Sequence, residues 1–170
     1  MPQIKELLIE ELQDLLHAET QLTKALPKLA KAARHPKLKE AFENHLRQTE
    51  GQLERLNNAF ELLGAEATPK PCKGMAGLIQ EGDEAVSQGS EKEDLSADLA
   101  LIAAAQKVEH YEISGYGSAR CLARQIGETE VATLLSRTLG EEESADYLLS
   151  EIAKPILQQA SLEDLEARAA

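Results

Sequence analysis

Five acidic residues fall in helical stretches at positions whose spacing otherwise carries apolar side chains: Glu19, Glu109, Glu112, Glu143 and Asp146. Steps of three and four keep each acid on a helix face that is otherwise apolar. An ionised carboxylate inside a core costs several kcal/mol unless it is paired or bound to a metal. We therefore interpret these acids as parts of a site.

The spacing adds a sixth acid. Glu19 and Glu50 are 31 residues apart, and so are Glu112 and Glu143. In two antiparallel helix pairs with short turns, this spacing places the acids at similar heights. The sequence thus predicts one central layer to which each of four helices contributes carboxylates.

Carboxylate oxygens suit hard or borderline cations such as iron and manganese, and a carboxylate can bridge two of them. We predict two metal ions, iron first and manganese second, held by the following residues: Glu19, Glu50, Glu109, Glu112, Glu143 and Asp146. Glu142 fits the apolar stripe better than Glu143, whereas the 31-residue spacing favours Glu143. The choice between them stays open.

Other polar residues near these positions can be interpreted in more than one way. His45 is interpreted as a hydrogen-bonded core histidine, and His110 as a supporting or surface residue. Tyr116 lies on the core face one turn after Glu112, where it needs a hydrogen-bond partner or could be oxidised by the centre. Cys72 lies in a predicted loop, and its role stays open.

Composition limits the fold and the partners. Only 3% of the residues are aromatic and tryptophan is absent, which favours helices packed through Leu, Ala and Ile over a sheet. The net charge of −12 argues against nucleic acid or an anionic membrane as a partner. Without an apolar run of about 18 residues or a signal peptide, we expect a cytoplasmic protein with two reduced thiols.

The helix breakers divide a single domain, residues 1–170, into four long helices. We expect helices over residues 3–34, 36–63, 94–126 and 128–159, with Pro and Gly residues at the breaks. Residues 64–93 form a long crossover with a short helix near 75–87, and residues 160–170 form a tail of one or two exposed turns. This organisation predicts an all-α, ferritin-like antiparallel four-helix bundle.

Four strings resemble a known family: LPKLAKAA, CKGMAGLIQEG, EHYEISGYG and LGEEESADYLL. They are similar to the YciE/YciF family of ferritin-like proteins over about residues 3–160, and Glu109-x-x-Glu112 also resembles a rubrerythrin helix. The resemblance implies a ferritin-like fold, a di-metal centre, a homodimer and induction under stress. Where ferritin-like sites often carry Glu-x-x-His, this chain has Leu53 after Glu50 and Asp146 after Glu143.

Two function classes follow. The first is a di-iron or di-manganese oxidoreductase with O₂, peroxide or ferroxidase chemistry, which would need an unknown electron donor because the sequence lacks a Gly-rich cofactor loop and a cysteine cluster. The second is a non-catalytic metal-binding or buffering stress protein that acts through dimerisation or a partner. A third alternative is a helical bundle whose inward acids pair with Lys and Arg.

Overall fold

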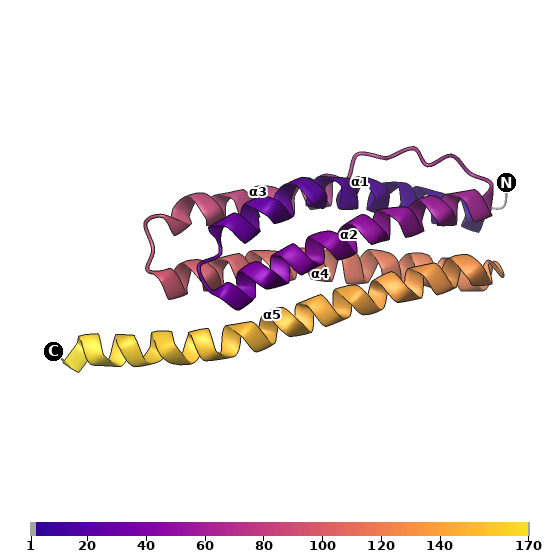
Figure 1. Cartoon of the computed structure of the whole chain (residues 1–170). Helices are drawn as coiled ribbons and strands as arrows, with labels where there is room; N and C mark the ends of the chain where they lie inside the picture. Colours follow the sequence, from indigo (N-terminus) through magenta and orange to yellow (C-terminus); the bar gives the residue numbers. More distant parts are fainter. Residues whose placement is uncertain (1–2, 170) are drawn as a thin grey trace.

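A computed structural model describes residues 3–169, without the side chains of residues 164 and 169. The described chain forms five helices: α1 (Gln3–Ala32), α2 (Pro36–Leu63), α3 (Lys73–Gly89), α4 (Asp94–Gln125) and α5 (Thr129–Ala169). Four of them are long and lie roughly along one direction (Figure 1). The prediction of an all-helical bundle is confirmed for the described residues, whereas residues 1–2 and 170 of the predicted domain lie outside them.

Short breaks at proline and glycine set up two antiparallel pairs. Pro36 begins α2, and the buried Asp98 of α4 accepts hydrogen bonds from the backbone N–H groups of Arg34 (2.9 Å) and His35 (2.7 Å) in the α1–α2 turn. Gly127 has φ 81° and separates α4 from α5. The turns pair α1 with α2 and α4 with α5 (Figure 1).

The two pairs join side by side. Helix α2 contacts α5 and α1 contacts α4, which closes a bundle of four long helices. The crossover after Gly64 runs back beside α1 and leads into α3, which packs against both α1 and α4 (Figure 1). Helix α3 therefore covers the α1–α4 side, whereas the α2–α5 side has no such cover among the described helices.

The element bounds agree closely with the sequence, with one correction. The predicted tail of one or two separate turns is wrong, because α5 continues through Pro155 to Ala169 as one helix that projects beyond the bundle (Figure 1). No glycine or proline follows Pro155, and the segment is rich in Leu, Glu and Ala, which favour helix. Proline inside the helix removes one backbone donor but does not end it here.

The apolar core has two halves. One half contains Leu22 and Leu26 of α1 packed with Leu38 and Phe42 of α2, together with residues of α3, α4 and α5. The other contains Leu8 and Leu12 of α1, packed with residues of the other three long helices. Every long helix has buried polar positions between these halves, and the buried polar residues Asp98 of α4 and Thr138 of α5 lie outside this interval. The fold thus places a polar layer across the middle of an apolar bundle.

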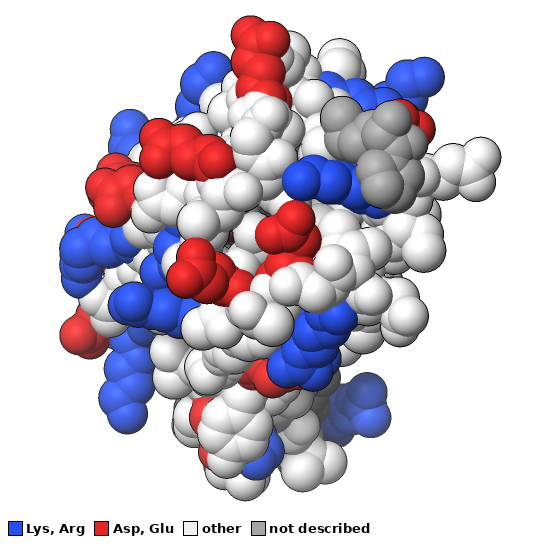
Figure 2. All heavy atoms as spheres, turned by 90° about the vertical axis from the view of Figure 1, so that its right-hand side faces the viewer, with Lys and Arg blue, Asp and Glu red and all other residues white. Residues whose placement is uncertain are grey.

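Charged side chains of both signs are distributed over the surface. Figure 2 looks at the end of the bundle where α2 ends and α5 begins, and acidic and basic side chains alternate there with uncharged ones. None of the helices in the described part of the chain has the length and apolarity needed to cross a bilayer.

Gly64 provides a test of the crossover. It has φ 63° and ψ 34°, and its N–H donates to the Glu61 carbonyl at 3.0 Å. Gly64→Ala should lower the free energy of unfolding by about 1 kcal/mol, because a Cβ is strained in this conformation. Gly77→Ala is the matched control: it lies inside α3 with open space around the added Cβ and should stabilise by about 0.5 kcal/mol. Equal changes in the free energy of unfolding of the two variants, measured by urea denaturation, would contradict the left-handed conformation of Gly64.

The two free cysteines should differ in reactivity. Cys72 is buried, its Sγ lies 3.0 Å from the Tyr111 hydroxyl, and burial raises the pKa of its thiol. Cys121 is exposed. Because the thiolate is the reactive species, a chromogenic disulfide reagent should label Cys121 at least about tenfold faster than Cys72 in the native protein. Mass spectrometry of the labelled peptides measures both rates, and faster labelling of Cys72 would refute this burial.

Candidate metal centre

Three carboxylates enter the polar layer from α1 and α4. Glu19 and Glu112 have no exposed surface, and Glu109 is 3% exposed. Glu109 and Glu112 are one turn apart on α4, so both point to the same side of the helix. The Tyr116 hydroxyl, one turn further on, donates a hydrogen bond to Glu19 Oε1 at 2.5 Å. Helices α1 and α4 are thus linked directly at this layer.

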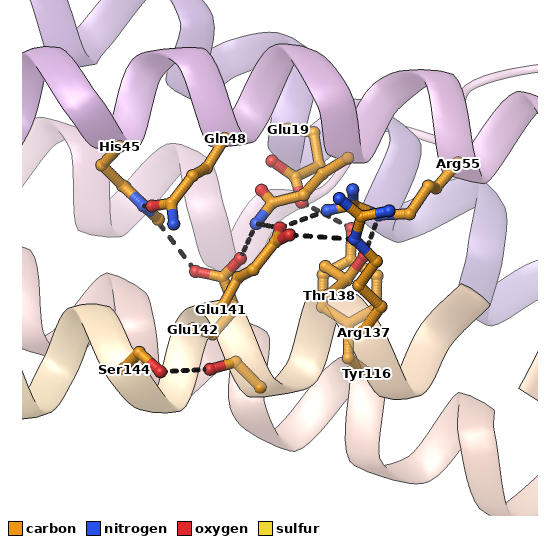
Figure 3. Close-up of polar contacts among 12 residues, drawn as sticks. Glu19, His45, Gln48, Arg55, Tyr116, Arg137, Thr138, Glu141, Glu142 and Ser144 are labelled. Carbon is orange, nitrogen blue, oxygen red and sulfur yellow. Dashed lines mark hydrogen bonds and ion pairs between the residues drawn. The ribbon is translucent and has the colours of Figure 1, made fainter. Parts of the chain in front are cut away.

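Helices α2 and α5 supply the rest of the layer. His45, Thr49 and Gln52 are the buried polar residues of α2, and Glu142 is fully buried on α5. Gln52 Nε2 donates to Glu142 Oε1, which orients that carboxylate. Figure 3 shows Glu142 of α5 facing His45 of α2. His45 Nε2 lies 3.4 Å from Glu109 Oε1 and 3.5 Å from Glu142 Oε2. The imidazole therefore faces carboxylates from two different helices.

The buried oxygens lack donors. Among the described residues, both oxygens of Glu112 and one oxygen each of Glu19, Glu109 and Glu142 have no hydrogen-bond partner, nor does His45 Nε2. No Lys or Arg of the described chain forms an ion pair with these four acids, and Arg55 pairs instead with Glu141 at the edge of the layer. This arrangement argues against the alternative in which inward acids pair with Lys and Arg.

Burial raises the pKa of every one of these carboxyls. Desolvation raises the pKa of Glu19 to about 8, and the charge of Glu142 adds to it, whereas the Tyr116 hydrogen bond opposes it. Desolvation likewise raises the pKa of Glu109 to about 8. The pKa values of Glu112 and Glu142 rise well above the ordinary range, again through burial first. Without a cation, the layer must hold protons at neutral pH.

The donor set fits a metal. One ligand atom from each of His45, Glu109, Glu112 and Glu142 lies within 4.8 Å of all the others. Ligands on opposite sides of an ion at about 2.1 Å are about 4.2 Å apart, so a small contraction would let one ion reach all four. Glu19 brings a further unpartnered oxygen. Four carboxylates would balance two divalent cations, and the imidazole is neutral as a ligand.

The six predicted ligands do not all lie in this layer. Glu19, Glu109 and Glu112 are buried together as expected. Glu50 and Glu143 are exposed, so the expected inward placement is corrected for both. Asp146 is half-buried outside the group, where it accepts a hydrogen bond from Gln106 Nε2 at 2.9 Å and lies 3.4 Å from His110 Nε2. The buried layer and the six predicted ligands therefore share Glu19, Glu109 and Glu112.

The position of each residue around its helix axis explains why Glu50 and Glu143 face outward. On α2 the buried stripe runs through Phe42, His45, Thr49, Gln52 and Leu56, in steps of three and four. Glu50 follows Thr49 and is turned about 100° away from it. On α5, Glu142 lies three residues after the buried Leu139, and Glu143 is turned outward. The open choice between Glu142 and Glu143 is thus decided in favour of Glu142 as the buried residue.

Sequence reasoning missed His45 as part of the group, and it missed Gln52 altogether. His45 was expected to be a hydrogen-bonded core residue. It is 5% exposed and its Nδ1 lies 3.2 Å from Gln48 Oε1, as expected, but its Nε2 faces carboxylates. A signal was present, because steps of three and four lead from Phe42 to Leu56 through His45, Thr49 and Gln52 as well as through Leu46, Thr49 and Leu53. The layer is therefore four carboxylates and one imidazole, not six carboxylates.

The raised pKa values predict how stability depends on pH in metal-free protein. The native state binds more protons than the unfolded chain above pH 4.5, the ordinary carboxyl pKa, and up to about 8 for Glu19 and Glu109. Unfolding in this window releases protons, so the free energy of unfolding should fall as pH rises. Denaturant titrations of chelator-treated protein at about pH 5 and about pH 8 measure this change.

Glu112→Gln is the matched comparison, because its amide has nearly the same shape but no charge to bury. The variant should lose measurably less stability than the wild type between about pH 5 and about pH 8, because burial raises the pKa of Glu112 in the native state. Wild-type stability that rises with pH across this window would refute the buried layer.

Comparisons with known proteins agree with this architecture. Residues 3–162 match the family described as "Domain of unknown function (DUF892)". Protein YciF of Escherichia coli (strain K12) is 45% identical over 157 residues, which cover 90% of this chain and 92% of YciF. The crystal structure of the E. coli stress protein YciF has a TM-score of 0.88 at 42% identity, covering 93% of this chain and 99% of that chain.

A second solved structure, YcfI from Rhodopseudomonas palustris, has a TM-score of 0.82 at 37% identity, covering 86% of this chain and 92% of that one. The resemblance noted from the sequence strings is confirmed by these matches. By its matched length and its identity to YciF, the chain belongs to the DUF892 family.

Proposed function

We propose that this protein is a ferritin-like carboxylate protein that binds two metal ions, iron or manganese, in the buried layer. The observation that carries the proposal is the set of buried carboxylate oxygens without hydrogen-bond partners beside His45 Nε2. Leaving several such atoms unpaired in a core is costly, and a cation removes that cost. His45, Glu109, Glu112 and Glu142 would hold the metal, with Glu19 as a further ligand.

Bound iron or manganese would supply redox chemistry toward O₂ or peroxide, or the oxidation of ferrous iron. The chain's own residues prepare the site. Gln52 holds Glu142 through Nε2–H, and Tyr116 keeps its proton on the hydroxyl while donating to Glu19. Burial raises the pKa of Tyr116 well above its ordinary value, so the hydroxyl remains a donor. The two apolar halves of the core exclude water from both sides.

A second candidate is a non-catalytic metal-buffering protein. Ferritin-like di-metal sites commonly carry two histidines, and this layer contains one. Fewer neutral ligands make the site more negative, which favours retention of a cation over cycling between oxidation states. Turnover would further require reducing equivalents from an electron donor supplied by another protein.

The cellular setting is also proposed. The relative YciF is described as a stress protein, and 45% identity supports a stress-related role for this chain. We place the protein in the cytoplasm and expect a homodimer. The projecting part of α5 supports a dimer, because Leu157, Leu162 and Leu165 are more than half exposed there.

Metal analysis tests the proposal. Protein purified without chelator, then exposed to Fe(II) or Mn(II) and desalted, should retain about two ions per chain and melt several degrees higher than apoprotein. Glu112→Gln should lose most of the metal, whereas Glu143→Gln, one residue from Glu142 but exposed, should retain it. Equal metal content in both variants, or a melting temperature that metal does not change, would refute the proposal.

The same loaded protein separates the two candidates. Consumption of peroxide or oxidation of Fe(II) well above the rate in buffer, and lost in Glu112→Gln, selects the oxidoreductase. Stable metal retention with rates equal to buffer selects the metal-buffering protein.

A further inference from the structure

A cavity of about 570 Å³ lies between α2 and α5, on the side of the bundle that α3 does not cover. His45 and Glu109, two members of the metal-binding group, form part of its wall. Dioxygen, peroxide or a metal ion would fill only a small part of such a space. Its volume is instead in the range of cavities that hold small organic molecules.

The cavity is apolar at one end and cationic at the other. Because α2 and α5 are antiparallel, Ala41 and Phe42 lie opposite Leu148 and Leu149, which line one end. Arg55 lies opposite Arg137 and Glu141 at the other end, separated from Phe42 by about 20 Å of helix. His45 and Glu109 lie along the wall between these ends.

The cationic end carries more positive than negative charge. Arg55 and Arg137 both pair with the single carboxylate of Glu141, Arg137 at 3.4 Å (Figure 3). Arg47 also lines the cavity, where it donates to the neutral side chain of Asn44. Three of the chain's seven arginines therefore line this cavity, two of them at its cationic end, although the whole protein has a net charge of −12. Such a local excess attracts an anionic group.

We infer that this cavity binds a linear organic anion, a carboxylate with an unbranched apolar chain, beside the metal-binding group. The ligand's carboxylate pairs with Arg137 and Arg55, which already hold one carboxylate between them. Its apolar chain runs along the wall past His45 and Glu109, toward the apolar end that Phe42 and Leu148 line. This inference rests on the proposed function only in placing the ligand next to a metal centre. The cavity lining itself requires no metal.

Octanoate is the probe, measured by calorimetry on metal-free and on metal-loaded wild-type protein. Saturable binding at one site per chain is expected. Affinity should rise about twofold to fourfold for each methylene from hexanoate to decanoate, because each added methylene is removed from water. Octanol or inorganic phosphate should bind at least about tenfold more weakly, since each lacks either the charge or the chain.

Two pairs of variants locate the site. Arg137→Gln should weaken octanoate binding about threefold to tenfold, and Arg124→Gln, an exposed arginine outside the cavity, should not change it. Leu148→Asn, 45% exposed and lining the cavity, should weaken binding, whereas Leu157→Asn, 52% exposed and outside it, should not. These residues are exposed, so the variants should fold, and circular dichroism checks this.

The experiments give different results when the cavity proposal is wrong and when the proposed metal centre is wrong. Octanoate that does not bind, affinity independent of chain length, or equal affinity in Arg137→Gln and Arg124→Gln overturns the inference while metal content is unaffected. The inference is also overturned if Leu148→Asn converts a dimer to monomers and neither form binds octanoate. This face would then be the contact with a second copy of the chain. Octanoate binding in protein that retains no metal supports the cavity and counts against the proposed centre alone.

Discussion

The cost of burying charge governs this structure. A layer of four buried carboxylates crosses the middle of an apolar bundle: Glu19, Glu109, Glu112 and Glu142. The His45 imidazole lies beside two of them, Glu109 and Glu142. The neighbouring side chains leave several of their oxygens without a hydrogen-bond partner. The layer must therefore either hold protons, which appears as raised pKa values, or hold cations. The two leucine-rich halves on either side supply the stability that such a layer removes.

The same constraint explains how the helices are arranged around the layer. Each of the four long helices contributes at least one polar group, so the layer forms only when both helix pairs are docked. Direct links cross the pairs: Tyr116 of α4 donates to Glu19 of α1, and Gln52 of α2 donates to Glu142 of α5. Helix α3 closes the α1–α4 side, which leaves the α2–α5 side as the route along which a cavity reaches the layer.

Periodicity was a reliable guide to the helices and a weaker one to the site. The apolar stripes and the Pro and Gly breaks predicted four long helices and the short crossover helix to within a few residues, except at the end of α5, because these signals are local. The acids on α4 were found because Glu109 and Glu112 interrupt an otherwise apolar face. Glu50 and Glu143 were misplaced because equal sequence spacing was given more weight than helix phase, and one residue turns a side chain by about 100°.

The sequence by itself determined the helical class, the breaks and the presence of inward acids, since each depends on neighbours within one or two turns. Only the tertiary structure decided which residues meet. His45 and Glu142 belong to helices that are paired through the packing of α2 on α5, and their 3.5 Å approach depends on the rotation of both helices. Rotation is set by how the whole core packs, and no local pattern contains it. The buried group that the packing assembles, four carboxylates with one imidazole, is therefore a property of the folded bundle.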